Sequence, residues 1–311
     1  MGLRTPLLAL ATAALATQGA AEMTAAEKTQ DEIRLGYLEH AALAQFHRWY
    51  QFYERPEGGV ENALDILSED VTVTSGLGTA NGHEEYRARV TQLPAEWKNA
   101  HHVRGTQIAH GEDGAMTLTA DIVYQNQGLL PDGAVREAEL TYTVELSPTE
   151  GLLPKLSEVT IAQDSESTGE TFEDAYAENR ALSLVHAYLA VIEDPSRDPE
   201  PMRELFAEDF ALNFSSGAIT TFEGFAEWLA GPGSQVAAST HIIENLSVEA
   251  AGDDRFEVSM EFDWAGFTPD GTDLLARTKH DWVVVNDPTE RFARIERVDV
   301  EVLEPFRPKD G

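Results

Sequence analysis

Four histidines at matching positions in the two halves of the chain are the side chains best suited to chemistry. His186 follows His47 by 139 residues, and His241 follows His101 by 140 residues. The imidazole group has an ordinary pKa of about 6.5, so it can accept and release protons near neutral pH. Histidines matched in this way indicate a site that occurs once in each half.

Aromatic side chains are expected on the same faces as these histidines. Strand residues alternate between two faces, whereas helix residues three or four apart share one face. This periodicity predicts two cavities, the second richer in histidine and aromatic rings and therefore the expected functional site. The first would contain His47, Tyr50, His101, Tyr124 and Tyr142, and the second His186, Tyr188, His241, Trp264, His280 and Trp282.

Three roles remain open for these residues. In catalysis, an imidazole would move a proton while a tyrosine hydroxyl donates to a developing oxyanion. In ligand binding, the rings would contact a small apolar or aromatic molecule. In a structural role, each histidine would only form hydrogen bonds at a helix–strand junction. A pocket carboxylate is disfavoured, because Asp121 and Glu261 fall on the strand face opposite the apolar residues.

The sequence lacks the signatures of metal and cofactor sites. Three imidazoles can hold zinc, but His186, His241 and His280 do not form a closely spaced ligand pattern. A glycine-rich dinucleotide motif, a phosphate-binding loop and a nucleophile elbow are all missing. We therefore predict neither a metal nor a cofactor. We expect the remaining histidines on the surface: His40, His83, His102 and His110.

The elements that would position these side chains also occur twice. Apolar residues at three- and four-residue steps predict long helices over residues 31–53 and 172–193. Alternating apolar residues predict strands in the regions 101–161 and 241–302. Between them, each half contains a short helix, a short strand and a further helix. Agreement in element order and apolar phase indicates a duplicated unit.

The boundaries of the two units follow from composition. Residues 163–170 are polar and acidic, without an apolar side chain, as is typical of a solvated linker. We place the first domain at residues 30–162 and the second at residues 171–304. Residues 1–21 have a positive charge, a short apolar run and small residues near its end, as in a secretory signal peptide.

The pattern of elements resembles a known family. An early long helix, the pair Glu69-Asp70 before the first strand and His101 at the start of the long hairpin resemble the SnoaL-like branch of the nuclear-transport-factor-2-like (NTF2-like) superfamily. The resemblance covers both halves. It implies the α+β class, with two cone-shaped domains whose helices pack on a curved antiparallel sheet around an apolar pocket. Many members form dimers through their sheets, so it also implies an intramolecular pseudo-dimer.

Composition limits the partners. A formal net charge of −33 argues against nucleic acid and against an anionic membrane surface. The absence of cysteine excludes disulfides and thiolate chemistry. With the signal peptide, these features predict a periplasmic or secreted protein that is not membrane-bound after cleavage.

Three functions fit these features. The first is an exported protein that binds a small apolar or aromatic molecule in a domain pocket. The second is a lyase, isomerase or hydrolase that uses a His–Tyr acid–base pair. The third is an interaction or scaffold module whose pockets are filled by side chains.

Overall fold

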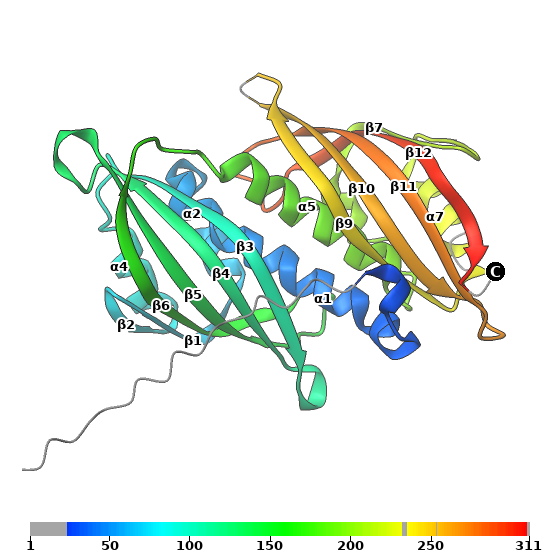
Figure 1. The fold of residues 1–311 in the computed structure, drawn as a ribbon, viewed down its shortest axis with the longest axis horizontal. Helices are drawn as coiled ribbons and strands as arrows, with labels where there is room; N and C mark the ends of the chain where they lie inside the picture. Colours follow the sequence, from blue (N-terminus) through cyan, green and yellow to red (C-terminus); the bar gives the residue numbers. More distant parts are fainter. Residues whose placement is uncertain (1–23, 232–234, 253, 310–311) are drawn as a thin grey trace, which may run out of the picture.

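The computed structural model describes residues 24–231, 235–252 and 254–309. The predicted signal peptide lies outside these residues. The described chain forms two α+β domains, each with one six-stranded sheet and its own helices, as the sequence predicts (Figure 1). No helix in the described ranges is both long and apolar enough to cross a membrane.

The first domain begins with helix α1 (Gln30–Trp49), whose start is determined by its cap. The Thr29 side chain accepts a hydrogen bond from the Glu32 backbone, and the Glu32 carboxylate accepts one from the Thr29 backbone at 2.7 Å. Such a reciprocal pair satisfies backbone donors that have no partner within the helix. The remaining elements are α2 (Gln51–Glu54), α3 (Glu61–Asp65), β1 (Leu67–Ser75), β2 (Gly78–Asn81), α4 (Gly82–Val90), β3 (Lys98–His110), β4 (Met116–Gln127), β5 (Val135–Ser147) and β6 (Lys155–Gly169).

The second domain repeats this order, except that it has one continuous helix where the first domain has α1 and α2. Its elements are α5 (Tyr176–Glu193), α6 (Met202–Leu205), β7 (Phe206–Phe214), β8 (Gly217–Ile219), α7 (Phe222–Ala230), β9 (Ala238–Ala250), β10 (Arg255–Phe267), β11 (Asp273–Val285) and β12 (Arg294–Pro308). The two sheets have equivalent strand orders, β2-β1-β6-β5-β4-β3 and β8-β7-β12-β11-β10-β9. All strand pairs are antiparallel except β1–β6 and β7–β12, which are parallel. The predicted duplication therefore extends to the topology of the sheets.

Helices α1 and α5 form the main contact between the domains and lie against each other between the two sheets (Figure 1). The N-terminal part of α1 also reaches the second sheet, where Ile33 packs with Ala265 and Phe267. Ala44, farther along α1, belongs to the hydrophobic core of the second domain. The arrangement fits the intramolecular pseudo-dimer, but helices form most of the contact, whereas the family resemblance implied sheets.

Residues 163–170 differ from the expected linker. Residues 163–169 continue β6 and pair with β5, for example Leu140 with Gln163 and Val135 with Gly169. This half of β6 extends past its pairing with β1 and is largely exposed, so no apolar side chain is needed there. The polar composition reflects a solvated strand.

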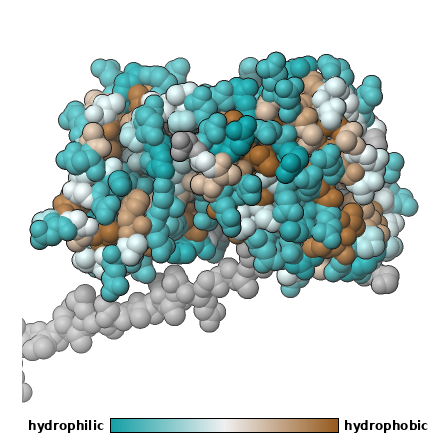
Figure 2. Space-filling model, turned by 90° about the horizontal axis from the view of Figure 1, so that it is seen from above, coloured by the Kyte–Doolittle hydropathy of each residue, from teal (hydrophilic) through white to brown (hydrophobic). Residues whose placement is uncertain are grey.

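Hydrophilic side chains cover most of the face in Figure 2, and apolar ones lie between them in smaller groups. Exposed large apolar side chains are found on β12, at Val302, Leu303 and Phe306, and at Leu77 and Leu129.

Candidate functional site

The first histidine network crosses from α1 to α5. His47 Nδ1 lies 2.9 Å from the Asn179 side-chain oxygen. The Asn179 amide nitrogen in turn donates to the Glu54 carboxylate, at 3.2 and 3.3 Å, and to the His101 carbonyl at 2.9 Å. Since the Asn179 oxygen accepts, Nδ1 of neutral His47 must carry its proton.

A second network has the same form on the other side of the helix pair. His186 Nδ1 lies 2.9 Å from His40 Nδ1, and His40 Nε2 lies 3.1 Å from the His241 carbonyl. His40 Nε2 is also 3.4 Å from Glu193. In this second network, His40 occupies the position that Asn179 has in the first, and Glu193 occupies the position of Glu54. The His47 and His186 rings stack between the two networks, with centroids 5.7 Å apart.

Each domain also contains a buried carboxylate–histidine pair. Glu54 accepts from the His101 backbone at 2.8 Å and lies 3.1 Å from His101 Nδ1. Glu193 accepts from the His241 backbone at 2.8 Å and lies 2.7 Å from His241 Nδ1. Both carboxylate side chains have no exposed surface. Each glutamate therefore connects the end of its helix to the first residues of the long strand hairpin.

Burial controls the charge of these groups. It lowers the pKa of His47 to about 4, although the hydrogen bond to Asn179 acts in the opposite direction. It lowers the pKa of His186 well below the ordinary value, and the neighbouring His40 and His47 add to this effect. For Glu193, burial raises the pKa, but the interactions with His40 and His241 outweigh burial, so the net shift is downward. At neutral pH the stacked imidazoles are uncharged.

The first predicted set comes together only in part. The His101 ring stacks on Tyr50 at 4.5 Å and lies 5.1 Å from Tyr124, and Tyr142 packs against Tyr50 at 6.0 Å. His47 instead faces α5 and its ring stack with His186. The Tyr50 hydroxyl is buried without a hydrogen-bond partner among the described residues. These rings pack directly on one another within the first hydrophobic core.

The second predicted set is also divided. Phe262 lies between His241 and His280, with ring centroids at 5.2 and 4.5 Å. Tyr188 packs on Trp282 at 5.1 Å, and both are buried in the second core. Burial and the nearby His241 lower the pKa of His280 to about 3.

Two members of the second set lie away from these rings. Trp264 packs on Phe306 of β12 at 4.8 Å. His186 lies at the helix pair with His40 and His47. The interior of the second cone is therefore occupied by Phe262, Trp282 and their neighbours.

Sequence reasoning missed part of the network. The expectation that His40 is a surface residue is wrong, because His40 is 6% exposed and lies between the helices. Glu54, Asn179 and Glu193 were not singled out. A signal was present: residues 40, 47 and 54 are seven apart, as are 179, 186 and 193, and the two series differ by 139. Seven-residue spacing returns side chains to nearly the same face of a helix.

A cavity of about 300 Å³ opens where the two domains meet. Its apolar lining comes from both domains, with polar groups from Gln45, Lys155, Glu204 and Arg291. The other lining residues are Thr149, Gly151, Leu152, Leu153, Ala187, Val191, Pro201, Leu205 and Phe292. By contrast, the gap beside His47, Glu54 and Asn179 has no room for a water molecule.

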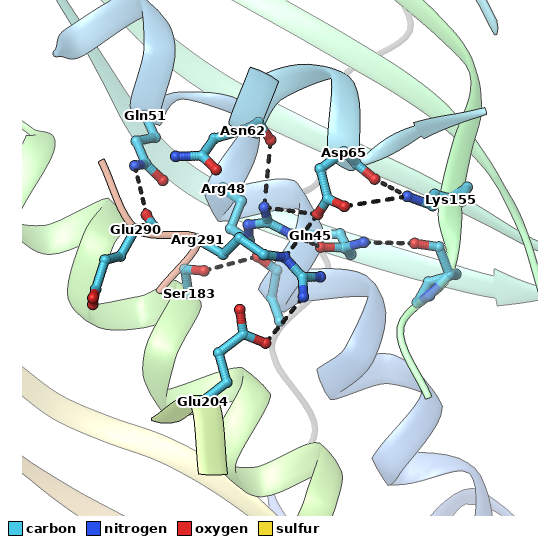
Figure 3. Close-up of polar contacts among 12 residues, drawn as sticks. Gln45, Arg48, Gln51, Asn62, Asp65, Lys155, Ser183, Glu204, Glu290 and Arg291 are labelled. Carbon is cyan, nitrogen blue, oxygen red and sulfur yellow. Dashed lines mark hydrogen bonds and ion pairs between the residues drawn. The ribbon is translucent and has the colours of Figure 1, made fainter. Parts of the chain in front are cut away.

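Charged residues cluster beside this cavity (Figure 3). Asp65 lies 3.0 Å from Arg48, 2.9 Å from Arg291 and 3.7 Å from Lys155. Arg291 also reaches Glu204, at 3.0 Å. Burial lowers the pKa of Arg48 to about 10, although Asp65 opposes this shift, so Arg48 stays charged at neutral pH.

Comparison with known proteins assigns the fold of the second domain. Residues 175–291 match the model of the SnoaL-like domain family. The second domain is a SnoaL-like domain. The first domain has the same strand order, so the two domains fit the predicted tandem arrangement.

Similar solved structures each correspond to one SnoaL-like domain in length. A hexachlorocyclohexane dehydrochlorinase from Novosphingobium barchaimii LL02 is 12% identical, and the alignment covers 42% of this chain and 88% of that one, with a TM-score of 0.37. An NTF2-like superfamily protein from Salmonella enterica is 15% identical, with coverages of 38% and 85% and a TM-score of 0.34. The search of curated proteins found no match.

Proposed function

We propose that this protein binds a small apolar or aromatic molecule in the cavity between its two SnoaL-like domains. The observation that carries the proposal is the contrast between this cavity, of about 300 Å³, and the packed cone interiors. Small-molecule sites are concave and mostly apolar, with a few polar groups, and they often lie between domains. The cavity lining has this composition.

The cone interiors support the same choice. The Phe262 and Trp282 side chains are almost fully buried in the second core, and Tyr50 and Tyr142 are buried in the first. A ligand in either cone would have to displace these rings. The cavity between the domains offers space without such displacement.

The binding site is tested by filling the cavity. Leu153 lines the cavity and is only partly buried, so Leu153→Trp adds a large ring there. Leu129→Trp is the control, because Leu129 is 45% exposed and lies away from the cavity lining. With 1-hexanol as probe, titration calorimetry should detect binding to the parent and the control but not to Leu153→Trp. Equal binding by all three proteins would refute the site.

An enzyme of the lyase, isomerase or hydrolase kind is the second candidate. The carboxylate–histidine pairs Glu54–His101 and Glu193–His241 favour it, because a carboxylate can orient and charge-stabilise a proton-transferring imidazole. In such an enzyme, the acid–base pair would be a histidine and a glutamate, whereas the sequence predicts a histidine and a tyrosine. Turnover that is lost in Glu193→Gln, with folding retained, would favour this candidate over binding alone.

We also propose that the chain is exported and works in a periplasm or outside the cell. The support is the composition of residues 1–21. Expression in a bacterium with a periplasm, followed by intact mass measurement, tests the proposal. The expected result is a periplasmic product cleaved near residue 21; a full-length cytoplasmic product would contradict it.

A further inference from the structure

The cavity between the domains has a counterpart that is filled. The offset of 139 residues that relates the two networks also relates Arg48 to Ala187, Gln51 to Ala190 and Asn62 to Pro201. The turn at residues 148–150 corresponds to the turn at residues 288–290. The pseudo-two-fold arrangement of the domains therefore predicts two equivalent spaces at their junction.

Long polar side chains occupy the counterpart. The Gln51 amide donates to the carbonyls of Pro288 and Glu290 at 2.7 and 3.1 Å. The Asn62 amide donates to the Thr289 carbonyl at 2.9 Å. The Arg48 guanidinium lies over the Phe292 ring, 4.9 Å from its centroid. Together these side chains fill the space beneath the turn.

The open cavity has no equivalents of the three polar side chains that fill its counterpart. Ala187 and Pro201 line the open cavity, and Ala190 is the equivalent of Gln51. Neither alanine nor proline has a side-chain group that could reach the opposite turn. The cavity is therefore the space at the positions where the second domain has small residues and the first domain has three polar side chains.

The charges beside the cavity are not balanced. Lys155, Arg291 and Glu204 line the cavity. Arg48 and Asp65, which form an ion pair at 3.0 Å, lie beside it, and Asp65 also contacts Lys155 and Arg291. The cluster has one positive charge in excess, in a chain whose formal net charge is −33. Lys155 and Arg291 both line the cavity, and their side chains are 34% and 38% exposed. An anionic group placed beside them would neutralise the excess.

We infer that the ligand is a small carboxylate with a short aliphatic or aromatic body. Its carboxylate lies at Lys155 and Arg291, since charged hydrogen bonds to carboxylates are stronger than neutral ones. Its apolar body lies against Leu153, Val191 and Phe292. This inference rests on the proposed function and adds the chemical class of the ligand.

Three probes of equal length test the class: hexanoate, 1-hexanol and hexylamine, each titrated calorimetrically into the whole chain. Hexanoate should bind roughly tenfold more tightly than the other two, corresponding to about 1.4 kcal/mol. Lys155→Gln should remove most of this preference, because it should weaken hexanoate binding far more than 1-hexanol binding. Equal or tighter binding of hexylamine would overturn the assignment.

Variants that fill the cavity provide a second test of the ligand site. Ala187→Arg restores the residue found at the equivalent position and should abolish binding of hexanoate. If this variant does not fold, Leu153→Phe, which copies the equivalent Phe292, should weaken binding instead. Hexanoate binding unaffected by a folded filling variant would overturn the site.

The outcomes separate the two proposals. If hexanoate and 1-hexanol bind equally and filling abolishes both, the carboxylate assignment fails and the proposed function stands. If none of the three probes binds the parent, both fail.

Discussion

His47 and His186 lie face to face between α1 and α5, and burial keeps both of them neutral. An unfolded chain would protonate them at their ordinary pKa, whereas the folded chain resists protonation. The two rings therefore make stability depend on pH, although neither lines the cavity between the domains.

His47 allows the sign of this dependence to be worked out. Below pH 6.5 the unfolded chain binds a proton at His47, and the folded chain does so only near its lowered pKa of about 4. The stability present above pH 6.5 is therefore lost progressively as the pH falls to about 4. This one group accounts for about 3 kcal/mol of unfolding free energy.

Replacing the imidazole by an amide tests this assignment. In His47→Gln the side-chain amide can still donate to Asn179, but it does not titrate. Urea unfolding between pH 7 and pH 4 should show a clearly smaller loss of stability for the variant. Identical pH profiles would mean that His47 is not responsible.

His40 provides a second prediction at this scale. Its equivalent, Asn179, makes the same three contacts in the first network, so His40→Asn should change the unfolding free energy by less than about 1 kcal/mol. His40→Leu should cost about 1–3 kcal/mol more, because Glu193 and His186 lose a buried partner. Urea unfolding of both variants is the measurement, and equal costs would contradict the equivalence.

At the scale of elements, α1 approaches β9 closely at one glycine. A Cβ atom at Gly36 would lie 2.7 Å from Thr240 Cβ and 3.1 Å from Glu193 Oε2. Thr240 is 2% exposed, so it has little freedom to move away. The absence of a side chain at Gly36 is what lets α1 lie on the second domain.

Gly36→Ala should therefore destabilise the protein, despite the better helix propensity of alanine. Overpacking of this kind typically costs about 1–3 kcal/mol. Gly76→Ala is the matched control, because nothing lies within 4 Å of a Cβ at that position. Thermal or urea unfolding should show a loss only for Gly36→Ala, and Thr240→Gly in the same chain should restore part of it. Equal stability of the two alanine variants would refute the close approach.

Much of the element order could be predicted from sequence, because apolar periodicity reports which face of a helix or strand is buried. Residues 163–169 were misread as a linker because a solvated strand needs no apolar residue. The contact of α1 with α5 has no such local signal. The cavity has no local sequence signal either, because it depends on the small size of Ala187 and Pro201 at the contact between the two domains.

At the scale of the whole molecule, the contact between α1 and α5 joins the two domains within one chain. Each domain therefore already packs against a partner domain, so we expect a monomer. Size-exclusion chromatography with light scattering should give a mass close to, and not above, the 34.1 kDa of the full sequence. A mass near twice this value would show that a further interface operates in solution.

The unequal junction has a consequence for how the protein could change over time. In a dimer of identical chains, one codon specifies the equivalent residue in both subunits, so a substitution that opens one space also opens the other and removes the polar contacts at both. In this chain, Arg48 and Ala187 are encoded by separate codons. One domain can therefore keep the polar contacts at the domain junction while a substitution in the other forms a binding cavity.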